Sequence, residues 1–177
     1  MNIEQFVAQC EGTWRSMRSS HSLSFQQFEN IISEITIKSL PIDKPEVLQL
    51  LNATAYSNSK VILPFSMKWD AESDWNNESS VENSTGSCIL IAIPESEHLG
   101  LMLRNLGYAE SIQAISQYEF TCDSTFNMTT KYSHSFVEEK IWFISENLRC
   151  RSSVLRSSSK KSILQTSFAS EIRRLNK

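Results

Sequence analysis

Apolar and polar residues alternate over short stretches of this chain, and each stretch ends in turn residues. Residues 33–40 give the clearest example, because Ile35 and Ile37 alternate there with Thr36 and Lys38. Similar stretches rich in β-branched and aromatic residues recur along the chain, at 12–25, 61–70, 87–94, 100–107, 111–122, 124–135 and 136–156. A period of two is typical of strands with one buried face. The pattern predicts an all-β fold, an antiparallel up-and-down barrel of eight to ten strands.

Helical spacing occurs at both ends of the sequence. Residues 2–10 place Ile3, Phe6, Val7 and Cys10 on one side, and Gly12 follows as a stop signal. Residues 166–177 place Phe168, Ile172 and Leu175 on one side in the same way. We therefore expect short N-terminal and C-terminal helices that flank the barrel, and a brief helix after Pro41.

Residues 136–156 read as a hairpin with a polar break at 145–147. Glu146-Asn147 lacks the Asn-Gly or Asp-Gly chemistry of two-residue hairpin loops, which favours a three-residue connection. That connection places one set of residues on a single face: Glu139, Ile141, Phe143, Arg149 and Arg151. A two-residue loop would instead put Glu139 and Arg149 on opposite faces.

Charged side chains on a barrel face have two interpretations. If the face is internal, Arg18, Glu139, Arg149 and Arg151 are buried charges, which are costly unless they are paired or neutralised. Such a set predicts an anionic ligand that carries hydrogen-bond donors of its own. If the face is external, the charges form a solvated cross-strand pair worth at most about 1 kcal/mol. Periodicity alone leaves both open.

Composition narrows the class of protein. The 177 residues fit a single domain, 1–177, and the net charge of −3 with a pI of about 5.7 does not indicate a nucleic-acid binder. No apolar run reaches the length of a membrane span, and no signal peptide is apparent. The four cysteines are widely spaced and the three histidines are isolated, so we expect no metal site and reduced thiols in a cytosol-like compartment.

Residues 71–86 are polar, acidic and rich in Asn, Ser and Gly, which predicts a mobile surface loop. Trp75 is unusual within it. A large aromatic residue on a polar loop either packs back on the body of the protein or contacts a ligand.

Three motifs carry a family resemblance. Gly12-Thr13-Trp14 after a short helix resembles the G-x-W signature of lipocalin-like calycin barrels. Together with MKWD at 67–70 and EEKIWFISENLRCRSS at 138–153, it resembles the S-type phycobiliprotein lyases, the CpcS/CpeS family, and within it the phycoerythrobilin branch. The resemblance implies a lipocalin-like barrel that binds an open-chain tetrapyrrole and attaches it by a thioether bond to a cysteine of a phycobiliprotein subunit.

The resemblance also implies a site. Its residues would be Arg18, Trp69, Trp75, Glu139 and Arg149, with Met67, Asp70 and Arg151 in addition. Glu139 would be catalytic, as the partner of the ring nitrogens and the proton donor to ring A, whereas Arg149 and Arg18 would hold the propionates.

Partners and compartment follow from the same resemblance. No cofactor would be permanently bound, and phycoerythrobilin or phycocyanobilin would be the transferred substrate. The acceptor would be a phycobiliprotein subunit such as phycoerythrin β, in the cytoplasm of a cyanobacterial-type cell or in a plastid stroma; a homodimer is compatible with the family. Two alternatives remain. A non-enzymatic carrier of a bilin, a fatty acid or another apolar anion would use the same residues. In a structural or assembly factor whose barrel is merely packed, Glu139 and Arg149 would be an ion pair on the outside.

Overall fold

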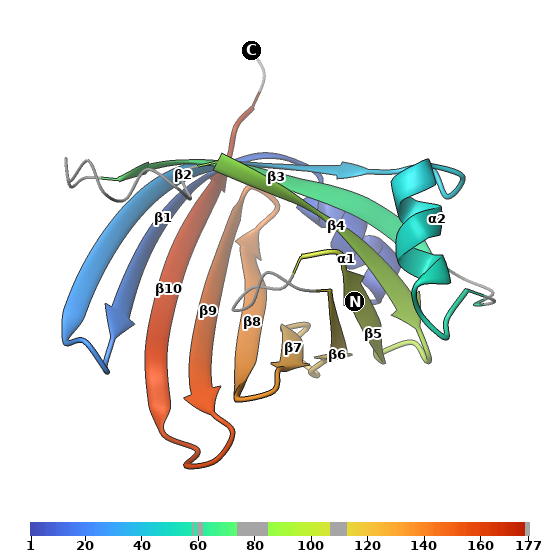
Figure 1. Cartoon of the computed structure of the whole chain (residues 1–177). Coiled ribbons are helices and arrows are strands. Elements are labelled where there is room, and N and C mark those ends of the chain that lie inside the picture. Colours follow the sequence, from blue (N-terminus) through green and yellow to red (C-terminus); the bar gives the residue numbers. More distant parts are fainter. Residues whose placement is uncertain (58, 60–61, 74–84, 107–112, 176–177) are drawn as a thin grey trace.

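Ten antiparallel strands form a closed barrel in this computed structural model (Figure 1). The structure describes the chain except for residues 58, 60–61, 74–84, 107–112 and 176–177. The strands are β1 (Gly12–Ser22), β2 (Gln27–Ser39), β3 (Leu63–Ser73), β4 (Thr85–Pro94), β5 (Leu99–Arg104), β6 (Ala114–Phe120), β7 (Phe126–Lys131), β8 (Ser135–Ser145), β9 (Leu148–Ser157) and β10 (Ile163–Arg173). Each strand pairs with its neighbours in sequence, and β1 also pairs with β10. The predicted up-and-down barrel is confirmed.

The expected C-terminal helix is wrong, because that segment is β10. Phe168 and Ile172 do point to one side, but their spacing also fits a period of two. Ala169 and Glu171 between them are buried inside the barrel. β10 pairs with both β1 and β9, so it supplies backbone hydrogen bonds that two open strand edges would otherwise lack. Closure of the sheet outweighs the local helical spacing.

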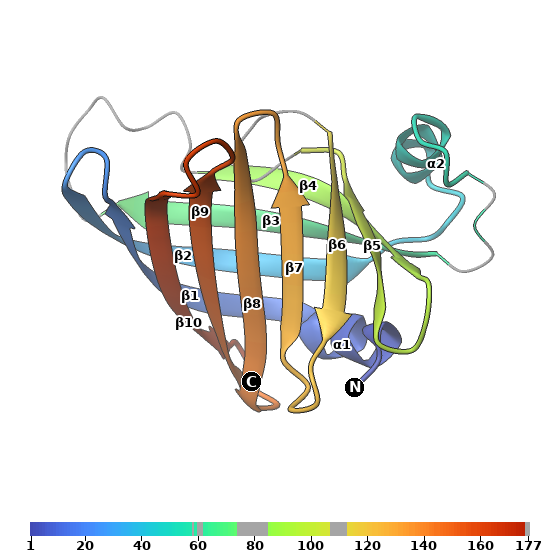
Figure 2. The same cartoon turned by 90° about the horizontal axis from the view of Figure 1, so that it is seen from below.

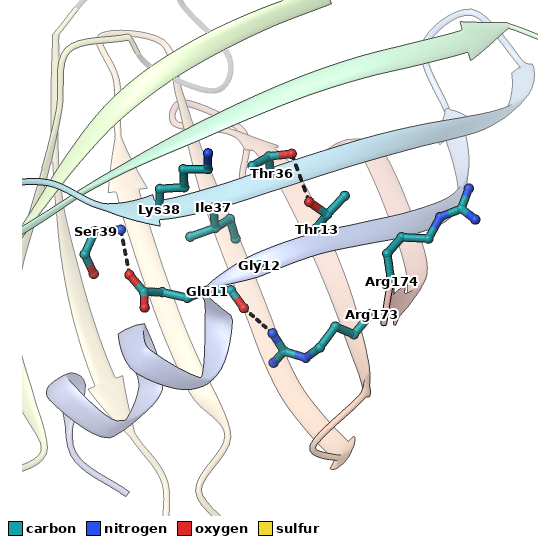
Figure 3. A pocket seen from close by; sticks show the side chains of 9 residues that line it. All are labelled: Glu11, Gly12, Thr13, Thr36, Ile37, Lys38, Ser39, Arg173 and Arg174. Atoms are coloured by element: carbon teal, nitrogen blue, oxygen red, sulfur yellow. Dashed lines mark hydrogen bonds between the residues drawn. The ribbon is translucent and has the colours of Figure 1, made fainter. Parts of the chain in front are cut away.

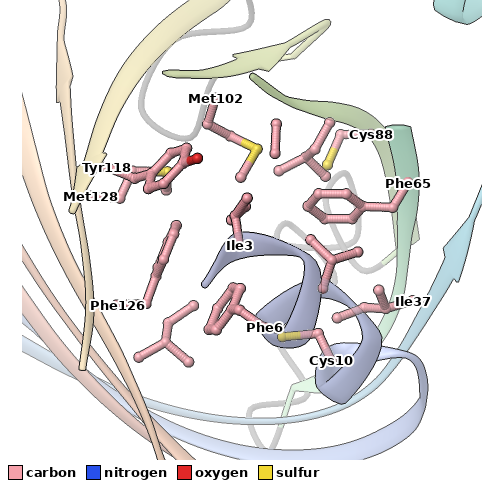
Figure 4. Packing of buried hydrophobic residues seen from close by; sticks show 14 of the residues in the cluster. Ile3, Phe6, Cys10, Ile37, Phe65, Cys88, Met102, Tyr118, Phe126 and Met128 are labelled. Atoms are coloured by element: carbon pink, nitrogen blue, oxygen red, sulfur yellow. The ribbon is translucent and has the colours of Figure 1, made fainter. Parts of the chain in front are cut away.

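The expected N-terminal helix is present as α1 (Ile3–Cys10), which lies across one end of the barrel (Figure 2). A capping box between Asn2 and Gln5 starts it. Its buried face enters an apolar cluster (Figure 4), in which the Phe6 ring stacks on Phe126 with centroids 4.3 Å apart. Burying such an aromatic ring contributes on the order of 2 kcal/mol. The helix therefore forms an apolar floor for the interior.

A second helix, α2 (Pro45–Asn52), packs on the outside of the barrel against β4 and β5. Its buried residues Val47 and Leu51 belong to one cluster with Ile91 and Leu103, which point outward from the sheet. Both faces of these two strands are consequently apolar. None of the helices in the described part of the chain is long and apolar enough to cross a membrane.

The hairpin of β8 and β9 differs from its prediction in one detail. Only Glu146 and Asn147 connect the strands, so the three-residue connection is wrong. Ser145 pairs with Leu148 and Phe143 with Arg149, which leaves Ile144 as a bulge. The extra residue in one strand restores the register that the longer loop was expected to give. Glu139, Phe143 and Arg149 therefore share one face, as predicted.

Candidate functional site

Charged side chains form a layer inside the barrel, which we call the buried charge layer. Its described members are Arg18, Arg104, Glu139, Arg149, Arg151 and Glu171. Glu139, Arg149 and Glu171 are at most 2% exposed, and Arg104 is also buried. Arg18 and Arg151 are half-buried, each with a buried Nε. The internal interpretation of the charged face is the correct one.

Register explains how distant residues meet in this layer. Arg18, Ala169 and Arg151 are successive partners across β1, β10 and β9, so the two arginines flank a small alanine. Ser16, Glu171 and Arg149 are successive partners in the next inward row. Side chains in one row of a closed sheet point to the same side. The strands thus bring residues of the first and last parts of the chain together.

Arg149 and Glu171 form a close pair at the base of the layer. The Arg149 Nε donates to Glu171 Oε2 over 2.5 Å, and the Ser16 hydroxyl donates to Oε1 over 3.3 Å. The Arg149 guanidinium also lies 4.4 Å from the centre of the Trp14 ring. Burial would raise the pKa of Glu171, but the guanidinium groups of Arg151 and Arg149, with these hydrogen bonds, hold that pKa below its ordinary value. Glu171 is therefore a carboxylate at neutral pH.

Arg104 and Glu139 form a looser pair. Arg104 Nη1 lies 3.7 Å from Glu139 Oε2, beyond hydrogen-bond distance. Within the described part of the chain, neither Arg104 Nε nor Glu139 Oε2 has a hydrogen-bond partner. Two buried charges therefore face each other here, and each keeps a polar atom that is free to form a further hydrogen bond.

Other buried polar atoms also lack a hydrogen-bond partner among the described residues. They include Arg18 Nε, Arg149 Nη2 and the Tyr118 hydroxyl. Burial, together with the negative charge of Glu95, raises the pKa of Tyr118 to about 12, so its hydroxyl keeps its proton at neutral pH. Buried donors and acceptors are nearly always satisfied in folded proteins. Several buried donors and acceptors without partners, gathered in one interior, are suited to hydrogen-bond a polar ligand.

The site residues expected from the sequence fall into three groups. Arg18, Glu139, Arg149 and Arg151 meet in the buried charge layer. Met67 and Trp69 lie on β3 and contact the apolar cluster beneath it. The Trp69 ring covers Gly86, where an added Cβ would lie 2.3 Å from the ring. Gly86 therefore leaves the room that Trp69 occupies.

Asp70 and Trp75 are not brought to this layer. Asp70 follows Trp69 on β3 and is exposed on the outer surface, between Glu34 and Thr85 in the ladder. It lines an outer hollow of about 440 Å³ together with Lys68. Trp75 lies outside the described residues.

Sequence analysis missed Arg104 and Glu171. Arg104 ends a strand whose two faces are both apolar, since α2 covers the outer one, so alternation gave no sign of its direction. Glu171 was assigned to a helix, and its inward position is visible only in the strand period of Ala169 and Glu171. A search for charges at a period of two through residues 163–173 would have found it.

A larger hollow of about 490 Å³ lies where α1 meets β1, and it is lined by residues of β1, β2 and the end of β10 (Figure 3). Arg173 donates there to the backbone oxygens of Gln9 and Glu11 and stacks on Trp14. The Glu11 side chain accepts from the Ser39 backbone N–H over 2.7 Å. These bonds tie β10 and β2 to the C-terminal end of α1, which is a structural role. None of the buried charge layer lines this hollow.

Comparison with known proteins identifies relatives over the whole chain. The model of the CpeS-like protein family matches residues 2–174. A chromophore lyase CpcS/CpeS 3 of Trichodesmium erythraeum is 42% identical over 175 residues, which is 98% of this chain and 99% of that protein. A putative phycoerythrobilin lyase CpeS of Microchaete diplosiphon is 41% identical over 85% of this chain and 66% of that protein.

The fold has a solved counterpart in the same group. The S-type phycobiliprotein lyase CpeS from Guillardia theta superposes with a TM-score of 0.83 at 31% sequence identity, over 100% of this chain and 95% of that one. The lipocalin-like ten-stranded barrel and the sequence motifs thus agree with the sequence comparisons. This chain belongs to the CpcS/CpeS family of chromophore lyases.

Proposed function

We propose that this protein binds phycoerythrobilin and attaches it by a thioether bond to a cysteine of a phycobiliprotein subunit, phycoerythrin β. The observation that carries the proposal is the charge of the buried layer. Among the described residues it holds four guanidinium groups and two carboxylates, an excess of two positive charges. A bilin carries two propionates, and a substrate with two carboxylates neutralises that excess.

Arginines and Glu139 would divide the recognition of the bilin. Arg18 and Arg149 hold the propionates through charge-assisted hydrogen bonds. The buried Arg18 Nε and Arg149 Nη2, which lack partners among the described residues, support this role. Arg151, which lies in the same row as Arg18 and is separated from it by Ala169, adds positive charge on the same side. The Glu139 carboxylate accepts hydrogen bonds from the N–H groups of the tetrapyrrole rings and favours the cationic, more reactive chromophore.

Apolar residues would hold the rings. Trp69 and Met67 are half-buried on the inner face of β3 and offer an aromatic face and a flexible thioether. The proposal keeps Trp75 and Asp70 as further contacts, with Trp75 closing over an apolar edge of the bilin. For Asp70 the exposed position on the outer face favours contact with the acceptor subunit over contact with the bilin.

The reaction is an addition that needs no oxidant and no leaving group. The acceptor cysteine loses its proton, its sulfur forms a C–S bond with the ethylidene carbon of ring A, and the ring system gains a proton. Glu139, a carboxylate in the free protein, takes up the proton of the acceptor thiol and donates it to the ring system, so that it ends the reaction as a carboxylate again. A barrel that fixes one extended conformer of the bilin also suppresses attachment in the wrong geometry.

Reducing conditions suit this chemistry, because the acceptor must present a free thiol. All four cysteines of the chain are free, two of them buried. We place the protein in the cytoplasm of a cyanobacterial-type cell or in a plastid stroma. The bilin is a transferred substrate, no cofactor stays bound, and a homodimer is compatible with the proposal.

Transfer to an acceptor tests the proposal directly. The protein is incubated with phycoerythrobilin and apo-phycoerythrin β, and a denaturing gel is read for covalent bilin fluorescence. A fluorescent acceptor band that depends on the protein supports the lyase. A colour change without any band contradicts transfer to this acceptor and favours the non-enzymatic carrier.

Glu139→Gln tests the assigned acid in the same assay. Removal of a general acid lowers a rate by roughly a hundredfold or more, so the acceptor band should form far more slowly while the barrel stays folded. Glu138→Gln is the matched control, because Glu138 is the adjacent residue on the outer face, paired with Arg156 over 2.9 Å. Equal transfer by Glu139→Gln and the control would remove Glu139 from the mechanism.

A further inference from the structure

Arg104 reaches Glu139 across the interior of the barrel, not along a ladder. It ends β5, whereas Glu139 lies on β8, and β6 and β7 separate the two strands in the sheet. The ladder neighbours of Arg104 are Leu90 and Ala114, which carry no charge. The contact between the two side chains therefore comes from their length and from the room inside.

Small residues on β6 and β7 make that room. Ser116 and Thr130 are fully buried partners whose hydroxyls share a hydrogen bond of 2.6 Å. They satisfy each other, so they do not compete for the Arg104 guanidinium. Ala114 keeps the wall beside Arg104 equally short. Because these neighbouring side chains are short and uncharged, Glu139 is the counter-charge of Arg104 in the described part of the chain.

The two acid–base pairs of the layer differ in how they are held. Arg149 and Glu171 are register partners 2.5 Å apart, and Ser16 fixes the carboxylate from the other side. Arg104 and Glu139 are 3.7 Å apart and share no hydrogen bond, and Arg104 Nε and Glu139 Oε2 have no hydrogen-bond partner among the described residues. The first pair is fixed in the wall and leaves only Arg149 Nη2 for a ligand. The second pair keeps both donor and acceptor capacity for a ligand.

We propose that Arg104 binds a carboxylate of the substrate and, in doing so, releases Glu139 to accept the pyrrole N–H bonds. This inference rests on the proposed function and adds to it a residue that sequence analysis did not find. Before binding, each buried charge neutralises the other. After binding, Arg104 faces a propionate and Glu139 faces the cationic ring system, so every charge keeps a partner.

The exchange predicts that Arg104 senses the charge of the propionate. We would measure dissociation constants by absorbance titration with phycoerythrobilin and with its dimethyl ester, which lacks the carboxylate charges. Wild type should bind the free acid more tightly. Arg104→Met should weaken binding of the free acid by about tenfold to a hundredfold, as expected for a charge-assisted hydrogen bond, and should weaken the ester far less. Arg104→Lys should recover part of the loss.

A double variant separates direct binding from simple charge balance. If Arg104 only neutralises Glu139, then adding Arg104→Met to Glu139→Gln should cause no further loss of affinity for the free acid. Direct binding of the carboxylate predicts a further loss in the double variant. Arg156→Met, which breaks an ion pair on the outside of the same barrel, is the matched control and should bind both ligands like wild type.

Several outcomes would overturn the inference. They are an equal loss for acid and ester, an unchanged affinity in Arg104→Met, and a double variant that binds the free acid as tightly as Glu139→Gln alone. If Arg104→Met does not fold, Arg104→Lys decides, since an ammonium group keeps preference for the acid over the ester at reduced strength. A wild-type protein that binds neither ligand would refute the proposed function itself, whereas binding without discrimination by Arg104 refutes only this inference.

Discussion

Glu171 and Arg149 are each 1% exposed and joined by a short hydrogen bond, so their charges depend on each other. Replacing one member of a buried pair strands the other charge and typically destabilises a protein by about 3–5 kcal/mol. We expect Glu171→Gln to lower the free energy of unfolding by about that amount at pH 7. Urea unfolding measures it.

The same pair predicts a dependence on pH. The pKa of Glu171 is lower in the folded protein than its ordinary value of 4.5, so its stabilisation is fully present above that value and is lost as the pH falls through the folded value. The difference in the free energy of unfolding between wild type and Glu171→Gln should therefore decrease in acid. Glu34→Gln, from an exposed pair with Arg174, is the control and should show a small difference at every pH. A difference in the free energy of unfolding that stays constant as the pH falls from 7 to well below 4.5 would contradict this account.

The cysteines differ in their availability for reaction. Burial raises the pKa of the Cys10 and Cys88 thiols, and nearby arginines only partly offset this, whereas Cys122 is exposed. At pH 7, iodoacetamide should modify Cys122 in the folded protein and reach Cys10 and Cys88 only after denaturation, as read by peptide mass spectrometry. Protein alkylated at Cys122 should still transfer the bilin, because the acceptor supplies the sulfur. Loss of transfer on alkylation would implicate a thiol of this chain.

The hairpin of β8 and β9 owes its register to one bulged residue, Ile144, which is exposed. Deleting Ile144 leaves a regular two-residue hairpin in which Phe143 still lies opposite Arg149. We therefore expect this deletion to preserve bilin binding, within about tenfold of wild type, at a modest loss of stability of about 1 kcal/mol. Absorbance titration and urea unfolding provide the measurements.

A second deletion in the same strand provides the contrast. Without Lys140, which lies in the regular part of β8, every residue on one side of the gap moves to the opposite face. Glu139 would then point to solvent, and binding should be lost. Similar effects of the two deletions would show that the bulge does not set the register.

Periodicity in the sequence predicted much of the barrel, because alternation of apolar and polar residues is a local signal. It also placed Glu139 and Arg149 on one face of one hairpin. It failed where the decisive partner is distant in the chain: residues 163–173 form a strand because β1 and β9 present open edges to them. No local pattern contains that information.

The same limit explains the missed half of the charge layer. Glu171 meets Arg149 through strand pairing, and Arg104 meets Glu139 across the interior, so neither contact leaves a spacing in the sequence. The orientation of Arg104 was hidden further by α2, which makes the outer surface of β5 as apolar as the inner one. Contacts between charges that depend on closure of the barrel can be identified only from the three-dimensional structure.

Pairing of β1 with β10 has a consequence for the order in which the protein matures on the ribosome. β1 precedes β10 along the chain, so its second ladder partner is not available until translation has passed residue 173. Ser16 and Arg18 therefore gain their ladder partners, Glu171 and Ala169, only when β10 has been synthesised. A nascent chain halted before that point lacks Glu171 and the strand that joins β1 to β9, so the buried charge layer is completed only by the last strand to be synthesised.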